Sequence, residues 1–218
     1  MRRLILVRHG QSLANAGGVT MAHADIPLTE LGRQQAATVA ERLPPAPSEL
    51  LSSPFVRALD TSRPYAERLG RSARPVPELQ EFDALDPALI VGLTGEQRRP
   101  IAEAYWADAD PQRRMGTQAE TFLEFAARVR RFREQRMPTL GREAVAFGHG
   151  IWISMLVWQL LGFGTRDSTD MRAFRRFQLG LPMDNTAIYC FDEVHDGRWL
   201  PQVGEPAGGA PAPRNMAS

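Results

Sequence analysis

Short apolar runs alternate with helical segments along the chain, and this alternation is the feature that most limits its fold. Residues 3–7 and residues 143–147 are two such runs, and a polar turn containing glycine follows each of them at once. Runs of this length and composition predict buried strands. The alternation predicts an α/β fold, in which a single domain forms a three-layer sandwich with helices flanking a mostly parallel central sheet.

Turn residues and apolar periodicity place the other elements. Thr29 is expected to cap a helix that ends before Pro44, and Ser53 to cap a helix whose first residue is Pro54. This second helix is expected to run towards residue 69, and Pro64 inside it is expected to kink or end it. Residues 80–116 have little periodicity apart from a helix near residues 101–107, which is typical of an insertion or lid. Further helices are expected at residues 118–137, from residue 151 and at residues 172–177, and further strands at residues 49–52, 74–77, 186–191 and 199–203.

The amino-acid composition excludes several kinds of catalytic and binding site. All 26 basic residues of the 218-residue chain are arginine, so no lysine can form a Schiff base or a Walker phosphate loop. The single cysteine, Cys190, excludes an intrachain disulfide and a thiolate zinc cluster. A formal net charge of +1 with interspersed signs argues against a nucleic-acid partner.

Domain organisation and location follow from the distribution of apolar residues. Residues 1–203 are predicted to form one domain, and residues 204–218, which are mostly Pro, Gly and Ala, a disordered tail. Residues 4–7 are too few for a secretory signal, whose apolar core needs roughly 7–15 residues. Residues 151–163 fall short of the roughly 20 residues that span a bilayer and predict a buried helix. We therefore expect a cytoplasmic protein without a membrane partner.

The first candidate site residue is His9, which directly follows the strand at residues 3–7. In open α/β sheets, ligands bind beyond the carboxyl ends of the strands. Arg8 offers a planar fork for phosphate or carboxylate oxygens, and Gly10 is expected to let a ligand approach the backbone. Taken alone, the same residues also fit a surface arginine beside a hydrogen-bonded loop histidine.

A second histidine, His149, lies between the strand at residues 143–147 and the helix that follows. The unpaired N–H groups at the start of that helix are expected to hold an anion. Arg57, one turn into the helix that Ser53 opens, could reach back towards the same sheet edge. A helix-capping histidine and a solvated arginine are the alternative interpretations.

These residue types together suit phosphoryl transfer. A neutral imidazole can attack phosphorus while arginines and a second, protonated histidine neutralise the phosphoryl oxygens. The leaving alkoxide needs a proton, so an acid must stand opposite the nucleophile.

Four sequence motifs contain these candidate residues or lie between them in the chain. They are Leu-Val-Arg-His-Gly-Gln-Ser-Leu-Ala-Asn at residues 6–15, Pro-Leu-Thr-Glu-Leu-Gly at residues 27–32, Ser-Ser-Pro-Phe-Val-Arg-Ala at residues 52–58, and Gly-His-Gly at residues 148–150. In this order they resemble the histidine phosphatase superfamily, which includes the phosphoglycerate mutases. The resemblance extends to about residue 191.

The resemblance implies a role for each matching residue. His9 would form the phosphohistidine, Asn15 would donate a hydrogen bond to phosphate, and Glu81 in Leu79-Gln80-Glu81 would be the proton donor. Family members often follow that glutamate with a glycine-rich stretch, which residues 82–86 of this chain lack, so Asp83 stays open as the alternative donor. Neither a metal nor a cofactor is implied. The phosphate pocket would comprise Arg8, Arg57 and His149.

The same resemblance leaves more than one activity open. Cofactor-dependent mutases carry an arginine–histidine–tyrosine–glycine run after the proton donor, and this chain lacks it. We therefore expect a metal-independent, acid-type phosphatase that acts on a small-molecule phosphate ester, with mutase activity as the alternative. A catalytically inactive binding module is less well supported, because every matching residue is retained.

Some residues match no family motif. His23 is expected to be a solvated loop histidine, His195 a turn residue, and the arginines of residues 128–136 a solvated helix face. Neither the identity of the substrate nor an oligomeric state follows from the sequence. Substrate selectivity is expected to come from residues 80–116, where Tyr105, Trp106, Arg98 and Arg99 could meet a leaving group.

Overall fold

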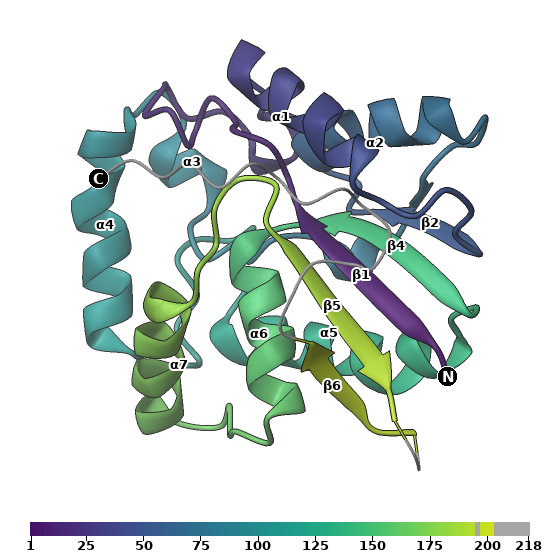
Figure 1. The fold of residues 1–218 in the computed structure, drawn as a ribbon. Helices are drawn as coiled ribbons and strands as arrows, with labels where there is room; N and C mark the ends of the chain where they lie inside the picture. The colour runs from purple at the N-terminus through teal and green to yellow at the C-terminus, as the bar shows by residue number, and fades with distance from the viewer. Residues whose placement is uncertain (195–196, 203–218) are drawn as a thin grey trace, which may run out of the picture.

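The computed structural model describes residues 1–194 and 197–202 and shows a three-layer α/β sandwich, as predicted (Figure 1). Its central sheet has six strands in the order β3-β2-β4-β1-β5-β6. Strand β6, the strand predicted near residue 199, lies at one edge of the sheet. The strands are β1 (Arg3–Arg8), β2 (Glu49–Ser52), β3 (Arg74–Pro75), β4 (Glu143–Gly148), β5 (Ile188–Glu193) and β6 (Trp199–Gln202).

The register between β1 and β4 brings the two histidines to the same sheet edge. These strands are parallel and pair from Arg3 opposite Glu143 to Arg8 opposite Gly148, so both end at the same level. The next residue in each chain segment is a histidine. Strand β5 runs antiparallel to β1, and its amino-terminal end therefore lies at this edge as well.

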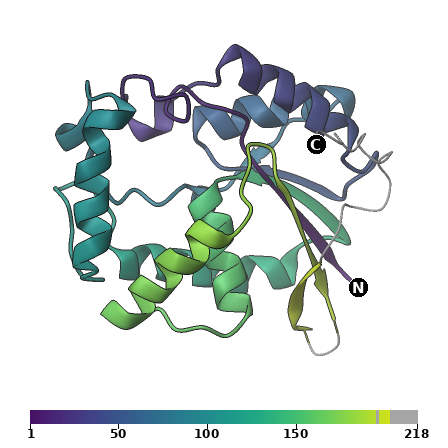
Figure 2. The same ribbon diagram turned by 60° about the vertical axis from the view of Figure 1, so that its left-hand side comes forward.

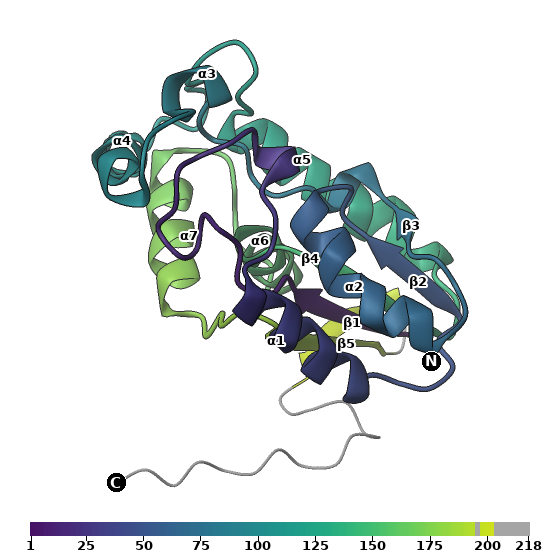
Figure 3. The ribbon, with the colours of Figure 1, turned by 90° about the horizontal axis from the view of Figure 1, so that it is seen from above.

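Alternating side chains of β1 hold helices on both faces of the sheet. Ile5 and Val7 belong to the core under α1 (Glu30–Glu41) and α2 (Val56–Arg68). Leu4 and Leu6 belong to the larger core under α5 (Phe122–Arg131) and α6 (Gly150–Leu160). Figure 3 shows α1 and α2 on one side of the strands and α5 and α6 on the other.

Residues 80–116 contain more helix than the sequence indicated. They form α3 (Pro87–Ile90) and α4 (Gly95–Asp108), and α4 begins with a capping box between Thr94 and Gln97. Only Tyr105 of α4 is buried, which explains why apolar periodicity revealed little of this helix. Together with α7 (Ser168–Gly180), α4 stands to one side of the sheet, beyond the end of β1 (Figures 1 and 2).

The start of α2 differs from the expectation, whereas its end agrees with it. Helix α2 begins at Val56 and not at Pro54, and the Ser53 hydroxyl accepts the Phe55 backbone N–H over 3.3 Å and lies 2.8 Å from His149 Nε2. The helix continues past Pro64 to Arg68, although a proline inside a helix costs about 3 kcal/mol. The fully buried Tyr65, which follows it, donates a hydrogen bond from its hydroxyl to the Pro44 carbonyl over 2.6 Å.

Helix α5 starts four residues later than expected, at Phe122 rather than at residue 118. A capping box between Thr121 and Glu124 defines this start, and it is visible in the sequence. No helix of residues 1–194 and 197–202 is long and apolar enough to cross a membrane. The predicted tail, residue 203 at the predicted domain boundary and His195 lie outside the described residues.

Candidate active site

Five of the six predicted site residues line one cavity of about 330 Å³ at the carboxyl ends of β1 and β4. The sixth, His149, lies behind this wall with its ring centroid 5.2 Å from that of His9. The structure therefore brings together residues that are up to 141 positions apart, counting from Arg8 to His149 (149 − 8). The five lining residues are Arg8, His9, Asn15, Arg57 and Glu81.

The surroundings of His9 determine which ring nitrogen can react. Nδ1 lies 2.7 Å from the Gly10 carbonyl oxygen, to which it must donate. The Arg57 Nε–H donates to Nε2 over 3.3 Å, so Nε2 carries the lone pair. Burial first, and the Arg57 charge second, hold the pKa of His9 well below its usual range. His9 is therefore a neutral imidazole with Nε2 as its basic nitrogen.

The backbone after His9 is held by a close contact with α1. A Cβ on Gly10 would lie 2.5 Å from the Gly32 carbonyl oxygen, and one on Gly32 would lie 2.0 Å from the Gln11 carbonyl oxygen. No side chain fits at either position without moving backbone. The glycine at position 10 thus allows the close approach of α1 to the loop that carries His9.

Arg57 is a buried cation with few charged partners. It is the second residue of α2, its Nη1 donates to the His23 carbonyl oxygen over 2.6 Å, and its guanidinium lies 4.9 Å from the Phe55 ring centroid. Burial lowers the pKa of Arg57 to about 10, and the Glu81 and Asp83 charges act in the opposite direction. Arg57 therefore stays charged at neutral pH, and a bound anion would stabilise it.

Arg8 is the second cation of the cavity wall. Its Nη1 donates to the Met183 carbonyl oxygen, and its Nε has no partner among the described residues. Burial lowers the pKa of Arg8 as well, with Glu81 as the main opposing charge. A Cβ on Gly150 would lie 2.9 Å from Met183 Cγ and 3.4 Å from Arg8 Nε, so a glycine there makes room for both side chains.

His149 is completely buried, and its Nε2 lies 2.8 Å from the Ser53 hydroxyl. Burial, followed by the charge of Arg57, holds the pKa of His149 well below its usual range. The sequence predicted a histidine that is protonated while it neutralises phosphoryl oxygens. In the free protein the neutral ring is favoured, because a second positive charge would lie unsolvated beside the arginine.

Stability is expected to fall as the pH drops below about 6.5, the ordinary pKa of histidine in an unfolded chain. The folded protein holds the pKa of both His9 and His149 below that value. The unfolded chain therefore binds protons first, and the free energy of unfolding decreases by up to about 1.4 kcal/mol per pH unit for each histidine. Urea unfolding at about pH 8 and about pH 5.5 measures this loss. The loss should be smaller in His9→Asn, and equal losses in the two proteins would contradict the assignment.

Glu81 occupies the place where the sequence suggested a bound anion. Its carboxylate accepts hydrogen bonds from the backbone N–H groups of Ile151 and Trp152, at 3.0 Å each, and of Phe82 at 2.9 Å. The amino-terminal end of α6 thus holds a carboxylate of the protein itself. Because Glu81 also lines the cavity, α6 fixes an acid on the wall of the cavity that His9 and the arginines share.

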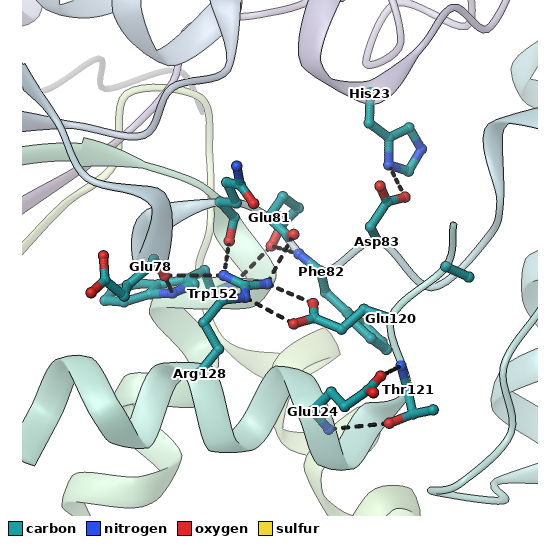
Figure 4. A network of polar contacts seen from close by, with 12 residues as sticks. His23, Glu78, Glu81, Phe82, Asp83, Glu120, Thr121, Glu124, Arg128 and Trp152 are labelled. Carbon is teal, nitrogen blue, oxygen red and sulfur yellow. Dashed lines mark hydrogen bonds and ion pairs between the residues drawn. The ribbon is translucent and has the colours of Figure 1, made fainter. Parts of the chain in front are cut away.

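Asp83, the alternative proton donor, has a different neighbour. Its Oδ1 lies 2.5 Å from His23 Nδ1, and it lines an adjoining groove instead of the cavity that contains His9. His23 is accordingly not a freely solvated histidine. It lines the cavity, and its contact with Asp83 joins the loop after β1 to the loop after Glu81 (Figure 4).

Arg128 of α5 holds the loop that carries Glu81 (Figure 4). Its guanidinium donates to the carbonyl oxygens of Glu78, Gln80 and Glu81 over 3.0, 2.7 and 3.2 Å. A bidentate ion pair with Glu120, at 2.6 and 2.8 Å, completes its contacts. The arginine side chain is only 11% exposed. The prediction of a solvated helix face is therefore wrong for this arginine.

Replacing Arg128 by methionine is expected to lower kcat about tenfold, because the Glu81 loop loses three hydrogen bonds to one buried cation. Activity should fall more for ethyl phosphate, which needs a proton on its leaving group, than for p-nitrophenyl phosphate, which does not. Arg131→Met on the exposed face of the same helix is the control. Equal losses for both substrates would contradict a positioning role and indicate a general loss of folded protein.

Asn15 is oriented by contacts to its carbonyl group. Oδ1 accepts from the Ser12 backbone N–H, the Ser12 hydroxyl and Asn185 Nδ2, at distances of 3.1–3.2 Å. The amide nitrogen is thus the group left to donate. Asn185 also donates to the His9 carbonyl oxygen over 3.1 Å. Asn185 was not predicted as a site residue, because its place depends on the direction of β5, which runs antiparallel to β1 and therefore begins beside His9.

The four residues that were expected to determine substrate selectivity lie in different places. Arg98 lines the cavity, whereas Arg99 is exposed. Tyr105 and Trp106 belong to a second, adjoining cavity. Within the described part of the chain, no group of three or more His, Cys, Asp or Glu side chains could hold a metal ion.

Comparison with known proteins places this site in a family. The profile of the histidine phosphatase superfamily (branch 1) matches residues 4–205. An adenosylcobalamin/alpha-ribazole phosphatase of Salmonella typhi is 38% identical over 135 residues, which cover 60% of this chain and 64% of that protein. A glucosyl-3-phosphoglycerate phosphatase of Mycolicibacterium vanbaalenii is 35% identical over 109 residues, which cover 50% and 48%. The chain thus spans between about half and two thirds of the length of these curated relatives.

Other relatives align over more of their length. A probable phosphoglycerate mutase of Photorhabdus laumondii is 31% identical over 166 residues, which cover 74% of this chain and 76% of that protein. The structure of a mycobacterial glucosyl-3-phosphoglycerate phosphatase in complex with VO3 superposes with a TM-score of 0.71 at 28% identity, covering 94% of this chain and 99% of that one. The family predicted from the four motifs is confirmed, and the chain belongs to the histidine phosphatase superfamily.

Proposed function

We propose that the protein is a phosphomonoester hydrolase that transfers the phosphoryl group of a small phosphorylated metabolite first to His9 and then to water. The observation that carries this proposal is the state of His9. It is a neutral imidazole whose basic Nε2 lies 3.3 Å from the Arg57 guanidinium, on the wall of a cavity that also contains Arg8 and Glu81. A nucleophile beside unpaired cations suits a phosphate dianion.

In the first step, the lone pair of His9 Nε2 attacks phosphorus and forms a P–N bond. The ester P–O bond breaks, its electron pair stays on the leaving oxygen, and protonated Glu81 gives that oxygen a proton. Arg8, Arg57 and the Asn15 amide nitrogen neutralise or hydrogen-bond the phosphoryl oxygens. Arg57 would exchange its hydrogen bond to His9 for one to phosphate.

In the second step, water attacks the phosphohistidine while the Glu81 carboxylate takes a proton from it. The P–N bond breaks, its electron pair returns to Nε2, and inorganic phosphate leaves. The phosphoryl group carries negative charge next to His149. Its binding would therefore offset the desolvation cost of protonating this ring. Positive charge for both steps comes from arginine, so we propose that no metal ion takes part.

The alternative is transfer of the phosphoryl group to a second hydroxyl, as in a mutase. Both kinds of activity occur in the names of the relatives, which include two phosphatases and a probable mutase. This chain lacks the mutase-type arginine–histidine–tyrosine–glycine run after Glu81. We therefore favour water as the acceptor.

The test is an assay of the purified protein with and without EDTA. We expect release of inorganic phosphate from p-nitrophenyl phosphate and ethyl phosphate at the same rate in both conditions. The mutase alternative is tested with 3-phosphoglycerate and 2,3-bisphosphoglycerate, by following the isomer ratio and phosphate release together. Isomer interconversion without net release of phosphate would overturn the hydrolase proposal, as would an activity that EDTA abolishes.

A further inference from the structure

A second cavity, of about 220 Å³, adjoins the phosphate site. The two cavities share three lining residues, His23, Arg98 and Ile151. The second cavity is not a closed void in the core, because some of its lining residues, among them Ala84 and Trp106, are partly exposed. A molecule bound at His9 could therefore extend from the first cavity into the second.

The wall of the second cavity is mostly apolar, and ring packing fixes it. The Phe82 ring stacks on Phe125 with centroids 4.6 Å apart and meets Trp106 edge-on at 5.9 Å. Phe82 directly follows Glu81 in the chain, so this wall begins next to the proposed proton donor. The apolar lining residues include Phe82, Leu85, Ile90, Ala102, Trp106 and Ile151.

We propose that this cavity is a leaving-group subsite that takes the ring of an apolar, ring-bearing alcohol, so that the preferred substrates are phosphomonoesters of such alcohols. This inference rests on the hydrolase proposal. In that reaction the leaving oxygen lies opposite His9, beside Glu81, and the remainder of the alcohol continues past Phe82. A dry apolar cavity of about 150 Å³ is enough to bind benzene in an engineered protein, so the volume here accommodates one ring with a short linker.

The polar groups at the junction are largely engaged by neighbouring residues. The Arg98 guanidinium donates to the Thr20 hydroxyl and, over 3.1 Å, to the Ala14 carbonyl oxygen. His23 Nδ1 lies 2.5 Å from Asp83 Oδ1. A polyhydroxylated chain would lose water against the apolar wall and gain few partners there, such as the Tyr105 hydroxyl, which has no hydrogen-bond partner among the described residues.

The experiment compares kcat/KM for 2-phenylethyl phosphate and ethyl phosphate. Both release an aliphatic alkoxide, so the comparison isolates binding of the ring from leaving-group basicity. We expect a ratio of about 10 to 100 in favour of the phenylethyl ester, from burial of the ring. Glycerol 3-phosphate, whose alcohol is polar, should resemble ethyl phosphate. A ratio near one, or a preference for the glycerol ester, would overturn the inference.

A matched pair of variants on α4 locates the effect. Ala102 lines the cavity, whereas Ala104 on the same helix is exposed. Ala102→Leu is expected to lower the substrate ratio at least about fivefold by filling the cavity, and Ala104→Leu to retain the wild-type ratio. The ratio is measured within one preparation, so the fraction of folded protein cancels. An unchanged ratio in Ala102→Leu, or an equal fall in both variants, would also overturn the inference.

Failure of the inference can be told apart from failure of the proposed function. If ethyl phosphate and p-nitrophenyl phosphate are hydrolysed in a His9-dependent way but the phenylethyl ester gains nothing, only the apolar subsite is wrong. If none of the esters is hydrolysed, the hydrolase proposal is overturned and the subsite with it.

Discussion

Alanine in place of His9 is expected to lower kcat/KM for p-nitrophenyl phosphate about 10⁴-fold or more, because covalent catalysis is lost with the nucleophile. The remaining cavity wall would still carry Arg8, Arg57 and Asn15. Inorganic phosphate should therefore still raise the melting temperature of the variant, since a ligand that binds only the folded state stabilises it. The combination of lost turnover and retained phosphate binding separates a chemical defect from a folding defect.

A trapping experiment gives an independent measurement for the same variant. Wild-type protein quenched during turnover of a phosphorus-32 ester should carry a phosphoryl group that is labile to acid and stable to base, and His9→Ala should carry none. Activity of His9→Ala within about tenfold of wild type would contradict nucleophilic catalysis by this residue. An equally labelled variant would assign the phosphoryl group to another residue.

The centre of the candidate site could be predicted because it follows from strand geometry. Two apolar runs predicted β1 and β4, and each run leads directly into a histidine. Parallel strands end at one edge of a sheet, so the separate motifs around His9 and His149 had to meet there. Arg57 was harder to place from its helix alone, since its contact with His9 depends on a helix start that the sequence placed two residues too early.

The supporting residues could not be predicted, because their contacts depend on tertiary packing. Arg128 has the spacing of an exposed helix position, yet the loop that carries Glu81 crosses this face and covers it. Asn185 reaches His9 only because β5 is antiparallel to β1, whereas helix–strand alternation predicts parallel neighbours. Only the second half of α4 was predicted, near residues 101–107, because this helix buries one side chain and therefore has almost no apolar periodicity.

Glutamine in place of Glu81 is expected to lower kcat for ethyl phosphate about 100- to 1,000-fold, and Asp83→Asn less than about threefold. Glu81 lines the cavity that contains His9, whereas Asp83 lies on the adjoining groove and pairs with His23. Glutamine has nearly the same shape and can still accept a backbone N–H through its carbonyl oxygen. It cannot donate an acidic proton or take one from water.

The choice of substrate shows whether Glu81 acts in both steps. p-Nitrophenolate is a weak base and leaves without a proton, so Glu81→Gln should still form the phosphohistidine from p-nitrophenyl phosphate. Hydrolysis of this phosphohistidine then lacks a base. A burst of p-nitrophenol close to one equivalent per enzyme should therefore precede slow turnover. If Asp83→Asn shows the burst and Glu81→Gln does not, Asp83 is the proton donor. Glu81 would then serve the structure, as the carboxylate that caps the start of α6.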